Sequence, residues 1–314
     1  MHQVLTIVLP VFAFLALGWL AASTKFLGRD VEWGLSTFTL WVAIPALLFR
    51  MMAESDLGKG SAWELWAAFF LAAAVVWIAA SLVAVALRRP AETSASFAMG
   101  ATFGNTVMMG IPLSLATFGD AAALPLALIT AVHAPILWLA STVQIEWARS
   151  SGENVNPIKL LRDLLVVLAK NPIIMALLLG LLWRATGLGL NSIVDDVISK
   201  LGQAAIPCAL FALGMSLAAY SLRGEIRAAP TLTFLKLGLM PLCVWVTAYH
   251  VFDLPPVWAG TALILAAVPT GLNGYLFAVK YDCGIASVSA TIALSTLISV
   301  VSLAMVIAYI NPSS

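Results

Sequence analysis

The stretch GNTVMMGIP, residues Gly104 to Pro112, interrupts an apolar segment with two glycines, an asparagine and a proline. Proline removes a backbone donor, and glycine weakens helical order. A helix that crosses a membrane is therefore expected to break here. Inside the hydrocarbon layer, broken backbone persists only where protein or a water-filled cavity surrounds it. The stretch thus predicts a binding site near the middle of the membrane.

The composition indicates a polytopic membrane protein. Hydrophobic residues make up 62% of the 314 residues and charged residues only 10%, whereas soluble domains carry about 25% charged residues. The net charge of +1 creates no field that would recruit nucleic acid. The three cysteines, Cys208, Cys243 and Cys283, are scattered and lack metal-binding spacing. We therefore expect a lipid bilayer around the chain, no nucleic-acid partner, and no metal or cofactor.

The apolar segments predict an all-α fold with ten membrane spans, because a span needs about 20 mostly apolar residues. The fourth and ninth predicted spans are interrupted by glycine, proline and asparagine. The ten ranges are Val4–Ala22, Leu35–Met52, Trp63–Leu87, Ser94–Phe118, Ala121–Trp147, Val166–Trp183, Ala204–Tyr220, Ala229–Val251, Val257–Lys280 and Ser287–Ile310.

Lysine and arginine counts predict the orientation of these spans. Connections on one side of the membrane hold eleven of these residues, and connections on the other side hold four. The richer side is expected to be cytoplasmic. The protein is therefore predicted in the cell (inner) membrane with both termini on the outer, periplasmic side.

An internal repeat relates the two halves of the chain. Pro10, Gly18 and Pro45 recur as Pro172, Gly180 and Pro207, each 162 residues later. The sequences AIPALLF and AIPCALF surround the last pair. Five spans in each half is an odd number, so the halves, residues 1–150 and 157–314, would insert with opposite topology. Inverted repeats of this kind are typical of secondary transporters.

The ninth span supplies a counterpart to the opening stretch. It reads AVPTGLNGYLF, from Ala267 to Phe277. The two stretches correspond by span and residue type, since Asn273 does not lie at the offset of 162 from Asn105. Interrupted spans in matching halves are a good indicator of a site at the midplane. The predicted site residues are Gly104, Asn105, Thr106, Pro112, Pro269, Thr270, Gly271 and Asn273.

This predicted site suits a small carboxylate. The N-terminal ends of the half-helices carry a partial positive charge, so they attract an anion without a formal charge. Asn105 and Asn273 add amide groups, and Thr106 and Thr270 add hydroxyls. In the alternative interpretation, the asparagines only satisfy the freed backbone.

Two ionisable residues lie inside predicted spans, where such residues are costly and usually functional. Lys236 could extend to the cytoplasmic interface, or it could face the site and attract an anion. His133, next to Pro135, could relay a proton, contact substrate or be a hydrogen-bonded core residue. The tenth span carries Ser287, Thr291, Ser295 and Ser299 on one helix face. This stripe is predicted to pack against the ninth span, with a lining role for Thr291 and Ser295 as the alternative.

The motifs resemble those of the auxin efflux carrier family, which includes plant auxin carriers and bacterial proteins described as malonate transporters. NTVMMGIPL (Asn105–Leu113) is similar to the fourth-span motif of the family, and VPTGLNGYLFAVKYD (Val268–Asp282) is similar to the ninth-span motif. The likeness extends over the whole chain. The plant ninth-span pattern has proline, glutamine and glycine, whereas this chain has Pro269, Thr270 and Gly271.

The resemblance implies an elevator-type carrier that forms a homodimer. Residues 1–60 and 166–222 would form the scaffold, and residues 61–150 and 223–314 the transport domain. Spans four and nine would cross at their breaks, where Asn105 would contact the substrate.

The expected function is secondary transport of a small organic anion, an auxin-like or malonate-like carboxylate. One alternative is a sodium- or proton-coupled symporter similar to bile-acid transporters, with His133 or the hydroxyls of the tenth span handling the ion. Another is a membrane sensor that does not transport. An enzyme is not expected, because His2, His133 and His250 have no catalytic spacing.

Overall fold

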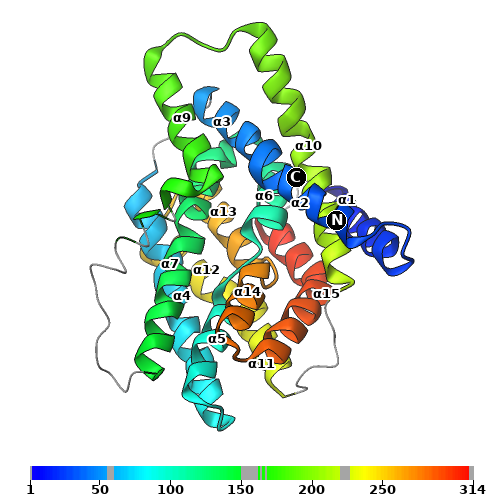
Figure 1. Cartoon of the computed structure of the whole chain (residues 1–314). Helices are drawn as coiled ribbons and strands as arrows, with labels where there is room; N and C mark the ends of the chain where they lie inside the picture. The colour runs from blue at the N-terminus through cyan, green and yellow to red at the C-terminus, as the bar shows by residue number, and fades with distance from the viewer. Residues whose placement is uncertain are drawn as a thin grey trace.

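The structure is a computed structural model that describes residues 2–54, 60–149, 162, 165–166, 168–219 and 227–310. These residues form helices and their connections, without a named β-strand (Figure 1). The helices are α1 (His2–Ser23), α2 (Arg29–Phe38), α3 (Ile44–Glu54), α4 (Ala62–Ala86), α5 (Ala91–Thr102), α6 (Ile111–Phe118), α7 (Ala123–Arg149), α9 (Pro172–Thr186), α10 (Ser192–Leu217), α11 (Ala228–Phe234), α12 (Met240–Val246), α13 (Pro256–Ala267), α14 (Leu272–Tyr281) and α15 (Ile285–Ile310).

Seven helical segments within the described residues are long and apolar enough to cross a membrane. Two further apolar helices, α9 and α13, are shorter. The fold is therefore an all-helical, multi-pass membrane architecture, and the exact number of ten spans stays a prediction. The predicted boundary between the halves, at residues 150–157, and the predicted domain boundary at residues 222–223 lie outside the described residues.

Helix α10 is longer than the seventh predicted span. It starts at Ser192 rather than Ala204 and continues through Pro207. The side chain of Asn191 accepts a hydrogen bond from the backbone N–H of Ile193 and so caps its start. The turns of α10 before Ala204 are polar, so the apolar pattern did not predict that the helix begins earlier.

Glycines allow close contacts between helices of the two halves. A β-carbon on Gly18 of α1 would collide with the backbone carbonyl of Phe211 in α10. A β-carbon on Gly180 of α9 would collide with the carbonyl of Phe49 in α3. The offset of 162 residues converts Gly18 into Gly180 and Phe49 into Phe211. The two helix pairs therefore use equivalent residues with the roles of the halves exchanged.

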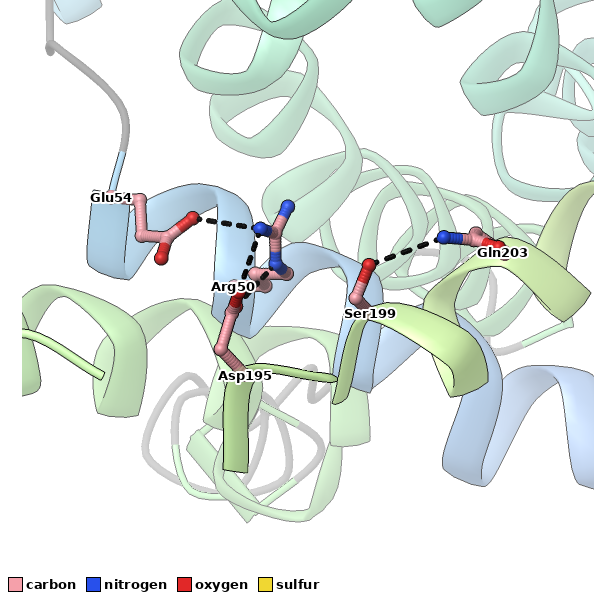
Figure 2. A network of polar contacts seen from close by, with 5 residues as sticks. All are labelled: Arg50, Glu54, Asp195, Ser199 and Gln203. Carbon is pink, nitrogen blue, oxygen red and sulfur yellow. Dashed lines mark hydrogen bonds and ion pairs between the residues drawn. The ribbon is translucent and has the colours of Figure 1, made fainter. Parts of the chain in front are cut away.

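A polar network joins α3 to α10, as Figure 2 shows. The Arg50 guanidinium donates to both carboxylate oxygens of Asp195, with Nε–Oδ1 and Nη2–Oδ2 distances of 2.6 and 3.1 Å. Its Nη2 also lies 3.3 Å from Oε2 of Glu54. These side chains are partly exposed, so solvent screens the ion pairs and they add little to the stability of the fold. The network fixes the relative placement of the two helices more than it stabilises the fold.

A separate core forms where α4, α5, α11, α12 and α13 meet. Phe69 of α4 and Phe97 of α5 are fully buried in it, surrounded by many alanines. Alanine keeps these helices close, as small residues commonly do in membranes. This close packing surrounds the ends of α5 and α13, where the candidate site lies.

Candidate functional site

Two interrupted segments meet as an isolated antiparallel bridge. Helix α5 ends at Thr102 and α13 ends at Ala267, and each is followed by extended backbone at Phe103 and Val268. The bridge pairs Gly104 with Thr270. The backbone N–H of Asn105 donates to the Pro269 carbonyl at 2.8 Å, and that of Gly271 donates to the Phe103 carbonyl at 2.9 Å. We call this pairing the Gly104–Thr270 bridge.

The sequence explains why both helices stop at the bridge. The residue before a proline is pushed toward extended backbone, which accounts for Val268 before Pro269. A β-carbon on Gly104 would lie 2.9 Å from Cγ2 of Val268, and one on Gly271 would lie 2.8 Å from Cδ1 of Phe103. Glycine is therefore required at both positions by the close approach of the two segments.

Asn105 caps the helix that restarts after the bridge. Its Oδ1 accepts a hydrogen bond from the backbone N–H of Met108 at 3.2 Å, which begins a π-helical turn, Thr106–Gly110, that leads into α6. Among the described residues, no acceptor is bonded to its side-chain nitrogen. Asn105 is 9% exposed. The amide oxygen thus serves the backbone, while the amide N–H groups make no hydrogen bond within the described residues.

Thr270 and Ser295 fasten the bridge to its neighbours. The Thr270 hydroxyl donates to the Gly100 carbonyl of α5 at 2.8 Å, and its backbone N–H donates to the Ser295 hydroxyl of α15 at 3.1 Å. Both residues are buried. The structure therefore gives the Thr270 hydroxyl a structural contact, and it brings Ser295 to the bridge.

The other predicted site residues take different places. Thr106 and Pro112 are buried in the restarted helix beyond Asn105. Asn273 is half-buried in the first turn of α14, whereas Asn105 stands before its helix as the cap. Thr291 donates its hydroxyl to the Ser287 carbonyl within α15. Asn273 and Thr291 are therefore not joined to the bridge by hydrogen bonds.

Lys236 points at the bridge rather than at the membrane surface. It lies in a π-helical turn, Leu235–Leu239, and is fully buried. Its Nζ donates to the Ala266 carbonyl at 2.6 Å. A β-carbon on Gly104 would lie 3.3 Å from this nitrogen. Extension of Lys236 to the cytoplasmic interface is thus excluded in this structure.

His133 lies in the same buried region. Its ring packs against Phe69 and Phe103, with centroid distances of 5.7 and 4.6 Å. The Thr102 carbonyl faces the ring, but neither ring nitrogen reaches hydrogen-bond geometry with any described residue. It also interacts electrostatically with Lys236. The sequence did not reveal that both basic residues converge on the two helix ends.

The family described as "Membrane transport protein" matches residues 3–307. The chain therefore belongs to this family, and the resemblance to auxin efflux carriers is confirmed. It is a membrane transporter and not an enzyme.

Two relatives are similar along nearly their whole length. A protein of Rhizobium meliloti (strain 1021) named "Putative malonate transporter" is 28% identical over 307 residues, which cover 96% of this chain and 93% of the relative. An "Uncharacterized transporter" of Methanothermobacter thermautotrophicus is 24% identical over 306 residues, which cover 94% of this chain and 95% of the relative.

Proposed function

We propose that this transporter carries a small carboxylate, of the malonate-like or auxin-like kind, bound at the Gly104–Thr270 bridge. The observation that carries the proposal is the Asn105 amide, whose N–H groups make no hydrogen bond within the described residues although the residue is almost buried. The side-chain nitrogen is not among the fully buried atoms that lack a partner, so these N–H groups remain accessible and can donate to an acceptor. The carboxylate oxygens of a substrate are suitable acceptors.

Charge at the bridge also favours an anion. The helix that restarts at Thr106 and α14, which begins at Leu272, both have their N-terminal ends next to the bridge. Such ends attract anions through their free N–H groups and dipoles. Lys236 adds a cation nearby. The name of the Rhizobium meliloti relative suggests malonate as the first compound to test.

The proposed architecture is ten spans in two inverted repeats, with the fourth and ninth spans crossing at the bridge. The equivalent contacts of Gly18 with Phe211 and of Gly180 with Phe49 support the inverted repeat. The bridge itself supports the crossing. This arrangement is typical of transporters that alternate their access around a midplane site.

An elevator-type movement and a homodimer complete the proposal. The helices α1, α3, α9 and α10 would form the scaffold, because α1 packs on α10, and α3 packs on α9 and α10. The compact core around α4, α5 and α13 would move as the transport domain. Two copies would associate through their scaffolds, with the termini of both on the periplasmic side.

Substitution of Asn105 tests the site. We expect Asn105→Asp to lower malonate flux in proteoliposomes at least tenfold, because aspartate keeps the oxygen that caps the helix but replaces the amide donors with negative charge. Asn191→Ala removes a cap of the same kind at the start of α10, away from the bridge, and is expected to change flux less than twofold. Full transport by a folded Asn105→Asp variant would exclude this role for the amide.

A further inference from the structure

We propose that the ammonium group of Lys236 is the resident cation of the Gly104–Thr270 bridge. This ammonium group takes the place of a bound alkali ion and makes carboxylate transport independent of sodium. This inference rests on the proposed function, since it concerns the same bridge. It assigns Lys236 the role of a positioning residue that holds the end of α13 beneath the substrate.

The position of the ammonium group is the first argument. Lys236 Nζ lies 2.6 Å from the carbonyl oxygen of Ala266, the next-to-last residue of α13. The last four carbonyls of a helix have no partner within the helix, and they carry a partial negative charge. In interrupted membrane helices, such carbonyls are the groups that coordinate sodium. The lysine nitrogen therefore occupies a place where a coupling cation would bind.

The surroundings of Lys236 are the second argument. The residue is fully buried, and a single β-carbon on Gly104 would already approach Nζ to 3.3 Å. Because the side chain has no exposed surface, a hydrated ion does not fit in contact with the ammonium group.

The absence of a countercharge is the third argument. Among the residues that the structure describes, no carboxylate forms an ion pair with Lys236. The titratable group that faces it is His133 of α7, whose ring nitrogens have no hydrogen-bond partner among the described residues. Within the described residues, the ammonium group therefore has a carbonyl partner and no carboxylate, and its field favours an anion bound at the bridge.

The two helix ends at the bridge each lie beside a basic side chain from another helix. Lys236 donates to the Ala266 carbonyl near the end of α13, whereas the His133 ring faces the Thr102 carbonyl at the end of α5 without a hydrogen bond. Lys236 therefore supplies at the end of α13 what a bound cation would otherwise supply.

The wild-type chain gives the first test. Malonate flux into proteoliposomes is measured in sodium chloride and again with all sodium replaced by choline at the same ionic strength. We expect the two rates to agree within twofold. A tenfold or greater fall without sodium would overturn the proposal, because a bound alkali ion would then be required.

Variants of Lys236 give the second test. Lys236→Met keeps most of the apolar stem without the charge, and we expect its flux to fall at least tenfold. Lys200→Met is the matched control, because Lys200 is exposed and pairs with Asp196 on the surface of α10. We expect this control to stay within twofold of wild type. A Lys236→Met variant with full flux would show that Lys236 only fills space.

A chemical rescue separates the charge from the stem. Lys236→Ala removes the atoms of an n-propylammonium ion. Added n-propylammonium is therefore expected to raise the melting temperature of this variant and to restore part of its flux, whereas tetramethylammonium, which has no N–H donors, should do neither. The melting temperature of the wild-type chain should respond equally to both ions. Equal responses of Lys236→Ala to the two ions would overturn the proposal.

The two proposals fail in different ways. If the wild-type chain transports none of a panel of mono- and dicarboxylates, the proposed function is wrong. The melting temperature of Lys236→Ala with n-propylammonium still decides whether the ammonium group is the cation of the bridge. Sodium-dependent carboxylate flux would instead retain the proposed function and remove the inference about Lys236.

Discussion

Gly104 has little room for a side chain at the bridge. Its missing side chain lets the backbone of one broken segment lie against Val268, the Leu265 carbonyl and Lys236 Nζ at the same time. Its neighbour Asn105 caps the restarting helix. Gly104 therefore supplies space and Asn105 supplies polar groups, and the bridge depends on both.

Gly104→Ala is expected to impair the bridge. The new β-carbon would lie 2.9 Å from Val268 Cγ2, so Val268 or the backbone beside it must shift, and overpacking of this kind costs about 1–3 kcal/mol. We expect a lower melting temperature and at least a tenfold loss of flux. Gly34→Ala is the control, because nothing lies within 4 Å of the new methyl group on α2. An unchanged melting temperature and flux for Gly104→Ala would contradict the tight contact.

The sequence predicted which residues break the helices and named Asn105, Thr270 and Ser295, but it did not predict how these side chains are bonded at the bridge. Glycine and proline act through local backbone preferences, so the breaks at Gly104 and Pro269 could be predicted. The partner of the first break is Thr270 rather than Asn273, because pairing depends on how the two backbones meet. The direction of Lys236 depends on the π-helical turn that carries it and on the packing of α13. Residue spacing predicts neither the pairing of the two backbones nor the direction of the Lys236 side chain.

Among the helices, the pairs α1–α10 and α3–α9 are built on the same principle. Each pair places a glycine of one helix against a backbone carbonyl of the other, at Gly18 with Phe211 and at Gly180 with Phe49. Close backbone approach of this kind replaces the hydrophobic effect as the source of helix association in lipid. These contacts predict rigid helix pairs that connect the two halves.

Gly18→Ala and Gly180→Ala are expected to lower the melting temperature by similar amounts. Each methyl group would collide with a carbonyl of the facing helix, and the cost again is about 1–3 kcal/mol. The variants are compared in one detergent by thermal unfolding, with Gly34→Ala as the shared control. A large effect at one glycine and none at the other would argue against equivalent helix pairs.

The whole molecule combines a polar bridge with an apolar exterior. Large hydrophobic side chains such as Leu9, Trp41 and Ile78 are exposed on its outer helices, as expected for surfaces that meet lipid. The charged residues that the structure describes lie mainly at helix ends, apart from the fully buried Lys236. Lys236 is thus an exception among the described charged residues, because it is buried inside the protein.

The proposed orientation of the whole chain can be tested with tags at its ends. Eleven lysines and arginines on one side against four on the other predict that both termini face the periplasm. Protease added to spheroplasts should therefore remove epitope tags from the N-terminus and from the C-terminus alike. Protection of both tags would reverse the orientation, and protection of one tag would contradict an even number of spans.

The Gly104–Thr270 bridge has a consequence for biosynthesis. The Asn105 N–H and the Phe103 carbonyl find their partners only in Pro269 and Gly271, which are synthesised much later. Until then these polar groups would be unpaired in a lipid environment, where each costs several kcal/mol. The first half of the chain therefore cannot complete its fold as it emerges from the ribosome. It must wait near the insertion machinery, or keep this segment hydrated, until the second half arrives to close the hydrogen bonds.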